Sequence, residues 1–410
     1  MKDIRNISQL QSRIKQAVIL AGGKGVRLQP FTYDRPKPMV EVNGRPFVDY
    51  LLDELKKNGI EEVVFLLGYF PEKIQEYLGD ETKHGIKVRY SVTPVDDATG
   101  TRIRKAKDML NERFLLMYCD NFIHLNLEKL QDFHVQKNAL MTKVVYTNQH
   151  GFTKNNVLVD DDGYVLIYDK PRTKPNLNGV DLGFFIVEKE ILTRMPAYDF
   201  WIYELFPGLI AERKLAGFTT DHLYYSLSTP ERMKLTERFF AHRKVIFLDR
   251  DGVINKKMPK GDYVKKWSEF KFLPGVKNAF KLLKDNGYEV YIISNQAGIG
   301  RGLMSEGDLF EIHKNMKKEI EAHGGKIVQI YYCPHGWNEN CLCRKPKPGM
   351  FFRAALDHQI DLPSAVFVGD DPRDEEAGTA AGCSTVLIKP DGSLLDVVKL
   401  LLSKWQEKKA

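Results

Sequence analysis

The sequence contains no long apolar run and no apolar leader. None of its hydrophobic stretches approaches the ~20 residues that a membrane-spanning helix needs. The first sixteen residues, MKDIRNISQLQSRIKQ, lack the apolar segment of a signal peptide. We therefore expect a cytoplasmic protein with no membrane partner.

Cysteine is also scarce, with five residues in a chain of 410. Such a low content excludes a fold that depends on a disulfide framework. Three of the five cysteines fall between positions 333 and 343. In a reducing compartment this clustering indicates a metal site before it indicates disulfides. The other two, Cys119 and Cys383, are expected in the core.

Charge of one sign is not in large excess. The net charge of +7 is small for this length, and the lysines are dispersed. No basic stripe or base-stacking motif accompanies them, so we expect no nucleic-acid partner. A mild positive excess fits phosphorylated substrates equally well.

Apolar strands alternating with helical patterns are present in both halves. This alternation predicts an α/β fold with a largely parallel sheet in each half. The strands expected in the first half are 16–20, 62–67 and 114–118, with a helix over 47–58. Those expected in the second half are 244–248, 289–294, 326–332, 365–369 and 384–388, with helices over 276–286 and 394–409.

The domain boundary is not marked by a flexible linker. The chain has no Gly/Ser-rich segment, internal repeat or low-complexity stretch, and the two halves meet near residues 236–243. We expect an N-terminal arm over 1–13, a first domain over 14–240 and a second over 243–405.

A glycine-rich loop follows the first predicted strand in the string LAGGKGVRLQP. Gly22, Gly23 and Gly25 can adopt positive φ and let backbone N–H groups approach a phosphate. Arg27 adds a guanidinium that can bridge phosphate oxygens, and Lys37 could reach the same anion. A glycine-rich loop alone is a weak signal, because many are tight turns.

The longer string AVILAGGKGVRLQPFTYDRPKPMVEVNGRPFVDYLL resembles the signature of the sugar-1-phosphate nucleotidyltransferases. That family has a Rossmann-like fold and joins a nucleoside triphosphate to a sugar 1-phosphate, releasing pyrophosphate. The resemblance covers about residues 14–235. It implies that the glycines and Arg27 hold the triphosphate and that Lys37 lies on the phosphates during transfer. It also implies that Asp120 binds Mg²⁺ and that Lys170 binds the sugar phosphate.

The sequence departs from this family in two places. A GTAG-like segment is replaced by DDATGTRI at 96–103. The acidic position of a DIGTPE-like segment is Ser226, and a hydroxyl is a poor substitute for a carboxylate in magnesium binding. Asp221 is a candidate replacement. If the site is incomplete, the first half is a binding module for a sugar nucleotide rather than an enzyme.

A second candidate site begins at KVIFLDRDGVIN. Asp249 and Asp251 lie at the tip of an apolar strand, where residues i and i+2 of an extended chain point the same way. The expected supports are polar residues after later strands or in a later loop, namely Ser294, Asn295, Lys345, Asp370 and Asp374. In α/β sheets such residues converge at one edge.

Together these motifs resemble the haloacid-dehalogenase phosphatase superfamily over residues 243–390. The resemblance implies that Asp249 is a nucleophile that becomes an aspartyl phosphate and that Asp251 is the general acid/base. Ser294, Asn295 and Lys345 would bind the phosphate, and Asp374 would orient Lys345. Asp249, the backbone carbonyl of Asp251 and Asp370 would bind Mg²⁺.

The cysteine cluster forms a candidate zinc loop over 333–343. Three thiolates and one imidazole, from Cys333, His335, Cys341 and Cys343, suit a closed tetrahedral site. Zinc there would be structural, because no position remains for water. Arg344 follows the last ligand, so the loop would hold it at the phosphate pocket.

The string YYCPH…CLCRKPKPGMFFRAA resembles the D,D-heptose 1,7-bisphosphate phosphatases, although related histidinol-phosphate phosphatases share the short cysteine gap. The fusion favours heptose, because a sugar-phosphate phosphatase and a sugar-1-phosphate nucleotidyltransferase form a consecutive pair. By resemblance to heptose-1-phosphate guanylyltransferases, the product would be GDP-D-glycero-D-manno-heptose made with GTP. The alternative is another sugar or amino-alcohol phosphatase beside a hexose-1-phosphate transferase. The sequence leaves a homo-oligomer open.

Overall fold

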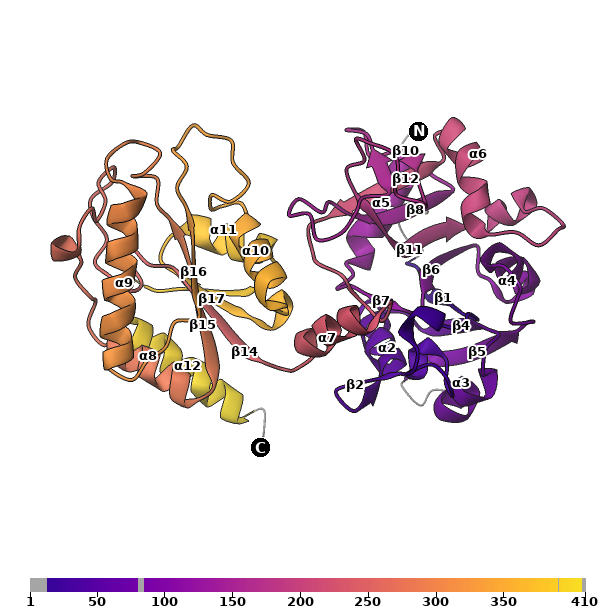
Figure 1. The fold of residues 1–410 in the computed structure, drawn as a ribbon, viewed down its shortest axis with the longest axis horizontal. Coiled ribbons are helices and arrows are strands. Elements are labelled where there is room, and N and C mark those ends of the chain that lie inside the picture. Colours follow the sequence, from indigo (N-terminus) through magenta and orange to yellow (C-terminus); the bar gives the residue numbers. More distant parts are fainter. Residues whose placement is uncertain (1–12, 80–84, 390, 408–410) are drawn as a thin grey trace, which may run out of the picture. The chain divides into compact units, whose positions relative to one another are not determined.

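The computed structural model describes residues 13–79, 85–389 and 391–407. The chain divides into two compact units between Arg238 and Phe239 (Figure 1). The expected N-terminal arm lies outside the described residues except for Arg13. No described helix is both long and apolar enough to cross a membrane.

The first unit is built on a seven-stranded sheet with the order β12-β8-β11-β6-β1-β4-β5. The pairs formed by β1 with β4 and β6 are parallel, as expected. Strand β11 departs from the expectation, because it runs antiparallel to both of its neighbours. The strands are β1 (Gln16–Ala21), β4 (Glu62–Leu67), β5 (Lys87–Val92), β6 (Arg113–Tyr118), β8 (Met141–Tyr146), β11 (Val180–Glu188) and β12 (Leu215–Thr220).

Helices and short strand pairs surround this sheet. Buried side chains of β1 and β4 form a core with residues of α4 and α6. The helices are α2 (Phe47–Lys57), α3 (Pro71–Leu78), α4 (Thr99–Lys105), α5 (Leu127–Lys137), α6 (Phe206–Ala211) and α7 (Pro230–Phe239). The short pairs are β2 (Glu41–Val42) with β3 (Arg45–Pro46), β7 (Asn121–Phe122) with β13 (Tyr225–Ser226), and β9 (Val157–Val159) with β10 (Val165–Tyr168).

The second unit contains a five-stranded sheet with the order β16-β15-β14-β17-β18, in which every pair is parallel. All five predicted strands are confirmed, although β16 begins three residues later than expected. The strands are β14 (Lys244–Leu248), β15 (Tyr288–Asn295), β16 (Gln329–Cys333), β17 (Val366–Gly369) and β18 (Ser384–Leu387).

Helices cover both faces of this second sheet (Figure 1). Successive residues of β14 point to opposite faces. Ile246 and Leu248 therefore pack in one core with α8, α9 and α12, whereas Val245 and Phe247 pack in another with α10 and α11. The helices are α8 (Val276–Asp285), α9 (Glu306–Ala322), α10 (Gly349–His358), α11 (Pro372–Ala380) and α12 (Leu394–Glu407). The predicted α/β class is thus confirmed in both units.

Candidate functional sites

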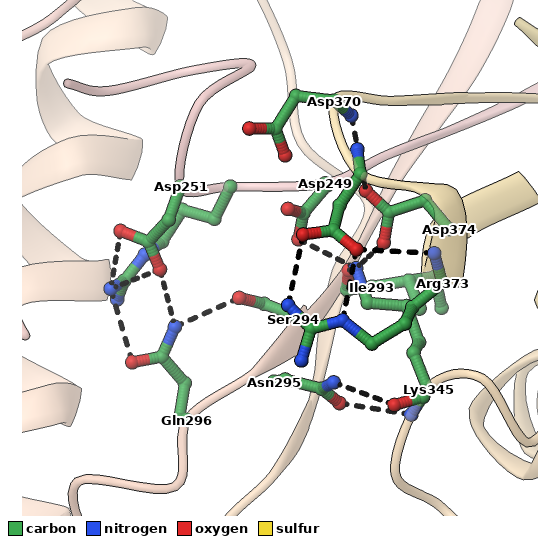
Figure 2. A network of polar contacts seen from close by, with 12 residues as sticks. Asp249, Asp251, Ile293, Ser294, Asn295, Gln296, Lys345, Asp370, Arg373 and Asp374 are labelled. Atoms are coloured by element: carbon green, nitrogen blue, oxygen red, sulfur yellow. Dashed lines mark hydrogen bonds and ion pairs between the residues drawn. The ribbon is translucent and has the colours of Figure 1, made fainter. Parts of the chain in front are cut away.

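Three neighbouring strands of the second unit bring polar side chains to one edge of the sheet. Asp249 follows β14, Ser294 and Asn295 end β15, and Asp370 follows β17. The strands are parallel, so their carboxyl ends lie together, which is where ligands bind in open α/β sheets. Figure 2 shows these residues around a common centre.

Lys345 is the buried cation of this site, with 3% of its side chain exposed. Its Nζ lies 2.8 Å from Asp249 Oδ1 and 2.6 Å from Asp374 Oδ1, and it donates to the carbonyl of Ile293 at 3.0 Å. Asn295 fixes the Lys345 backbone through two 3.0 Å hydrogen bonds. Burial lowers the pKa of Lys345, but the two carboxylates outweigh it and the net shift is upward. The lysine therefore stays charged.

Three carboxylates lie close enough to share a cation. Ligand atoms of Asp249, Asp370 and Asp374 are all within 4.8 Å of one another. Burial raises the pKa of Asp249 in spite of Lys345, and burial also raises the pKa of Asp370. Asp370 Oδ1 is buried and accepts no hydrogen bond from any described residue. An unpartnered oxygen among crowded carboxylates fits a hard divalent cation such as Mg²⁺.

The carboxylate of Asp251 is held by three other side chains. Arg250 Nη2 donates to both carboxylate oxygens at 3.0 and 2.8 Å. Asn255 donates to Oδ1 at 2.9 Å and Gln296 to Oδ2 at 2.8 Å. Burial would raise the pKa of Asp251, but Arg250 and these hydrogen bonds lower it overall. In this arrangement Asp251 is ionised.

This geometry differs from the expectation that Asp249 and Asp251 point the same way. Strand β14 ends at Leu248, and the backbone bends at Arg250, between the two aspartates. Extended geometry therefore does not continue to Asp251. In Figure 2 the two carboxylates face different partners.

A cavity of about 1130 Å³ opens beside these residues. Asp249, Asp251, Ser294, Asn295, Lys345 and Asp370 all line it. Its outer wall carries further cations, from Lys257, Lys260, Arg344, Lys347 and Arg373. Two of these cations are paired with carboxylates of the same wall, Lys257 with Asp370 and Arg373 with Asp371. Arg344 lies at the cavity, where the sequence places it.

The four predicted zinc ligands lie together. Cys333 Sγ is 3.5 Å from His335 Nδ1 and 3.6 Å from Cys341 Sγ, and His335 Nδ1 is 3.2 Å from Cys343 Sγ. A tetrahedral site with Zn–S bonds of about 2.3 Å requires ligand separations of roughly 3.5–3.8 Å. Two of the three separations fall in this range, and the distance between His335 Nδ1 and Cys343 Sγ is shorter. The donor set and its spacing therefore fit Zn²⁺.

In the first unit the glycine-rich loop leaves the end of β1. Gly22 has no room for a side chain, because a Cβ there would lie 2.3 Å from Arg102 Cζ. Gly25 has a φ of +65°, a conformation that favours glycine. Gly23 is exposed, and Arg27 is exposed on the short 3₁₀ helix Val26–Leu28. The loop thus presents backbone and a guanidinium to solvent.

Lys37 and Asp120 meet at this loop although 83 residues separate them. Lys37 Nζ lies 2.6 Å from Asp120 Oδ2. Ser226 pairs with Asn121 across β13 and β7, so it lies beside Asp120, and its hydroxyl bonds that of Ser228 at 2.9 Å. Within the described part of the chain, Asp120 belongs to no group of three metal-ligating side chains.

Asp221 and Lys170 take other positions. Asp221 accepts hydrogen bonds from Thr147 and, at 3.0 Å, from Gln149. These two partners lie on the segment that follows β8. Lys170 is exposed on the turn after β10, and its Nζ lies 4.0 Å from the ring centroid of Tyr203.

Three buried polar residues at the two sites were not predicted. Arg102, in the divergent segment 96–103, donates to the carbonyls of Leu67, Pro94 and Val95 beneath the glycine-rich loop. Arg250 and Gln296 hold Asp251. For Arg250 and Gln296 the available signal was a charged or amide side chain directly beside a predicted site residue.

The position of Ser226 allows a direct test of the missing carboxylate. Ser226→Asp should lower the magnesium concentration for half-maximal nucleotidyl transfer by about threefold or more, because it adds a carboxylate beside Asp120, the Mg²⁺ ligand that the resemblance implies. Titrating Mg²⁺ in a pyrophosphate-release assay measures this. Ser226→Asn, which has the shape of the aspartate without its charge, is the control. An unchanged magnesium requirement in a folded, active Ser226→Asp variant would contradict the assignment.

Each unit matches a known protein family. Residues 16–217 match the family model "Nucleotidyl transferase", and residues 244–384 match "Polynucleotide kinase 3 phosphatase". The first unit also resembles the crystal structure of HddC from Yersinia pseudotuberculosis, at 22% identity over 55% of this chain and 100% of that one, with a TM-score of 0.47.

The relatives of the second unit are closer. The D-glycero-β-D-manno-heptose-1,7-bisphosphate 7-phosphatase of Pseudomonas putida is 41% identical over 146 residues, covering 36% of this chain and 82% of the relative. The α-anomer phosphatase of Mycobacterium bovis is 37% identical over 154 residues, covering 36% and 80%. The structure of D,D-heptose 1,7-bisphosphate phosphatase from B. bronchiseptica, complexed with magnesium and phosphate, is 35% identical over 39% of this chain and 99% of that one, with a TM-score of 0.37. The chain therefore joins an N-terminal nucleotidyl transferase domain to a C-terminal domain that belongs to the heptose-1,7-bisphosphate 7-phosphatase family of the haloacid-dehalogenase superfamily.

Proposed function

We propose that the chain is a bifunctional enzyme of nucleotide-activated heptose synthesis. Residues 243–405 would remove the 7-phosphate of D-glycero-D-manno-heptose 1,7-bisphosphate. Residues 14–240 would then transfer a nucleotidyl group to the heptose 1-phosphate and release pyrophosphate. The family membership of the second unit, together with its Asp249–Lys345–Asp374 site, carries this proposal.

In the phosphatase reaction, Asp249 attacks the 7-phosphorus and the bond to the heptose oxygen breaks. Asp251, after taking up a proton from solvent, gives it to that oxygen, and an aspartyl phosphate remains. Asp251 then takes a proton from the water that hydrolyses this intermediate. Lys345, charged and buried, neutralises the phosphate and the nucleophile, while Ser294 and the Asn295 region hold the phosphate oxygens.

Two metal ions, Mg²⁺ and Zn²⁺, are proposed for the second unit. Asp249, Asp370 and the Asp251 carbonyl would hold Mg²⁺, which offsets the negative charge that gathers at the phosphorus. The unpartnered Asp370 Oδ1 supports a cation there. Zn²⁺ bound by the four residues of the 333–343 loop would be structural, because the protein fills all four positions.

The transferase reaction needs cations more than it needs a base. Attack of the sugar phosphate on an α-phosphate brings anions together, so the site must supply positive charge and orientation. Backbone groups at Gly22, Gly23 and Gly25, with Arg27 and Lys37, would hold the triphosphate. Asp120 would bind Mg²⁺ and Lys170 the sugar phosphate. We infer GTP as the nucleotide donor, from the resemblance of the sequence to heptose-1-phosphate guanylyltransferases.

A product analysis tests the whole proposal. Heptose 1,7-bisphosphate is incubated with the protein, Mg²⁺ and each nucleoside triphosphate in turn, and mass spectrometry identifies the products. We expect heptose 1-phosphate in every reaction and GDP-heptose with GTP. If no triphosphate gives a sugar nucleotide at high magnesium, while sugar nucleotides still bind, the first unit is a binding module.

Arg27 provides a test that separates the two activities. Arg27→Ala should lower kcat/KM for transfer by about 10²-fold, since it removes one preorganised donor to the phosphates. Phosphate release from the bisphosphate should stay within about twofold, because the second unit has its own site. Arg35→Ala, which removes an arginine bonded to Asp34, is the control. Equal losses in the two arginine variants would argue against a specific role for Arg27.

A further inference from the structure

A buried polar cluster lies behind Asp251, and the proposed reaction uses none of its members. Arg250 and Gln296 have no exposed surface, and His313 of α9 is 8% exposed. Arg250 Nη2 donates to Gln296 Oε1 at 3.0 Å, and Arg250 Nη1 lies 3.3 Å from His313 Nε2. A buried ion pair such as that of Arg250 with Asp251 is weak evidence for stability. The buried charge of Arg250 therefore needs another explanation.

The contacts of Gln296 define the orientation of its amide. A guanidinium can only donate, so the atom that faces Arg250 must be the acceptor Oε1. The Nε2 group then has two hydrogens, and it lies 2.8 Å from Asp251 Oδ2 and 2.8 Å from Ser294 Oγ. One amide therefore contacts both the general acid/base and the phosphate-binding serine (Figure 2).

This orientation also determines what Ser294 can do. Its oxygen accepts from Gln296, so its hydrogen is left to donate in another direction. Ser294 lines the cavity beside Asp249, where the phosphate would bind. The amide of Gln296 thus prepares the serine as a donor to a phosphate oxygen.

Arg250 and His313 hold the amide in place. Because Arg250 donates, His313 Nε2 must accept and the imidazole is neutral. Arg250 Nε has no hydrogen-bond partner among the described residues, so the guanidinium is held through its two terminal nitrogens. Those nitrogens connect α9 to Asp251 and Gln296.

We propose that Gln296 is a positioning residue that couples phosphate binding at Ser294 to proton transfer at Asp251. The proposal rests on the phosphatase activity proposed above. Of the three side chains that donate to the Asp251 carboxylate, Gln296 is the one that also contacts the phosphate-binding serine, at 2.8 Å from each of the two groups.

Two substitutions separate this role from packing. Gln296→Met keeps much of the volume and removes both hydrogen-bonding functions. Gln296→Glu keeps the shape, but its carboxylate would accept the Ser294 hydrogen and repel Asp251. The matched control is Gln359→Met, since Gln359 is also buried in this unit but its Nε2 donates to the Leu356 carbonyl.

The assays are the Kd of inorganic phosphate and steady-state kinetics with an alkyl phosphate and with p-nitrophenyl phosphate. For Gln296→Met we expect phosphate to bind about tenfold more weakly and kcat for the alkyl phosphate to fall about 10²-fold, the scale of lost general acid catalysis. The loss with p-nitrophenyl phosphate should be smaller, because nitrophenolate leaves without a proton. Gln296→Glu should be worse than Gln296→Met in both measurements.

Three results would overturn the proposal. The first is a Gln296→Met variant whose phosphate affinity and kcat stay within about twofold of wild type. The second is an equal loss of kcat with the alkyl and the aryl phosphate, and the third is a similar loss of kcat in Gln359→Met. Thermal unfolding checks that each variant folds. Because phosphate affinity and aryl phosphate turnover do not require heptose, a wrong heptose assignment would leave these comparisons intact.

Discussion

Asp249→Asn is expected to release phosphate from the bisphosphate at least about 10³-fold more slowly than the wild type, on the scale of nucleophile losses in covalent catalysis. The amide cannot form an aspartyl phosphate, and it also removes a charge that Lys345 Nζ meets at 2.8 Å. Phosphate release measured with a coupled assay, on protein checked by thermal unfolding, gives the result.

The same variant should leave nucleotidyl transfer unchanged when heptose 1-phosphate is supplied, because transfer uses the first unit. It should also stop the formation of sugar nucleotide from the bisphosphate. Asp371→Asn is the control, since Asp371 lies in the same cavity but pairs with Arg373. Near-normal phosphate release by folded Asp249→Asn would contradict the role of Asp249 as the nucleophile.

In the second unit the order of the strands could be predicted because each buried strand is a short apolar run. In the first unit only β1, β4 and β6 were predicted, and the other four strands of the sheet were missed. In β14, alternate residues pack against different helices, so every residue after Lys244 is apolar and the strand is easily recognised in the sequence. The predicted start of β16 was too early. Ile327 and Val328 are apolar and β-branched, so they extend the strand pattern in the sequence, although β16 begins at Gln329. The direction of β11 could not be predicted, because strand polarity depends on pairing that no local pattern records.

The catalytic edge was predictable for a related reason. Parallel strands end at the same edge, so Asp249, Ser294 and Asp370 must meet whatever the loops between them do. The environment of Asp251 was not predictable in this way. Its partner Gln296 directly follows β15 and is fixed in turn by Arg250, which contacts His313 on α9. A chain of contacts between separate elements leaves no periodic signal in the sequence.

Loss of a zinc ligand should strongly lower the stability of the second unit. Elemental analysis of protein purified without chelator should give about one zinc per chain, as expected for a closed four-ligand site. Cys341→Ala should lower the stability of the second unit by at least about 3 kcal/mol, because structural zinc binding contributes directly to folding free energy. For a unit of this size that corresponds to a fall in Tm of roughly 6–12 °C.

Phosphatase activity should also fall when zinc is lost, because the zinc loop is followed closely by Lys345. Cys343 is two residues before Lys345, and Lys347 Nζ donates to the Cys341 carbonyl at 2.9 Å. Cys383→Ala is the matched control, since Cys383 is buried in the same unit and lies outside the cluster. Transfer by the first unit reports whether the effect is local. If zinc is absent and Cys341→Ala unfolds like Cys383→Ala, the cluster is a group of core thiols, and Lys345 must be held by Asn295 and the two carboxylates alone.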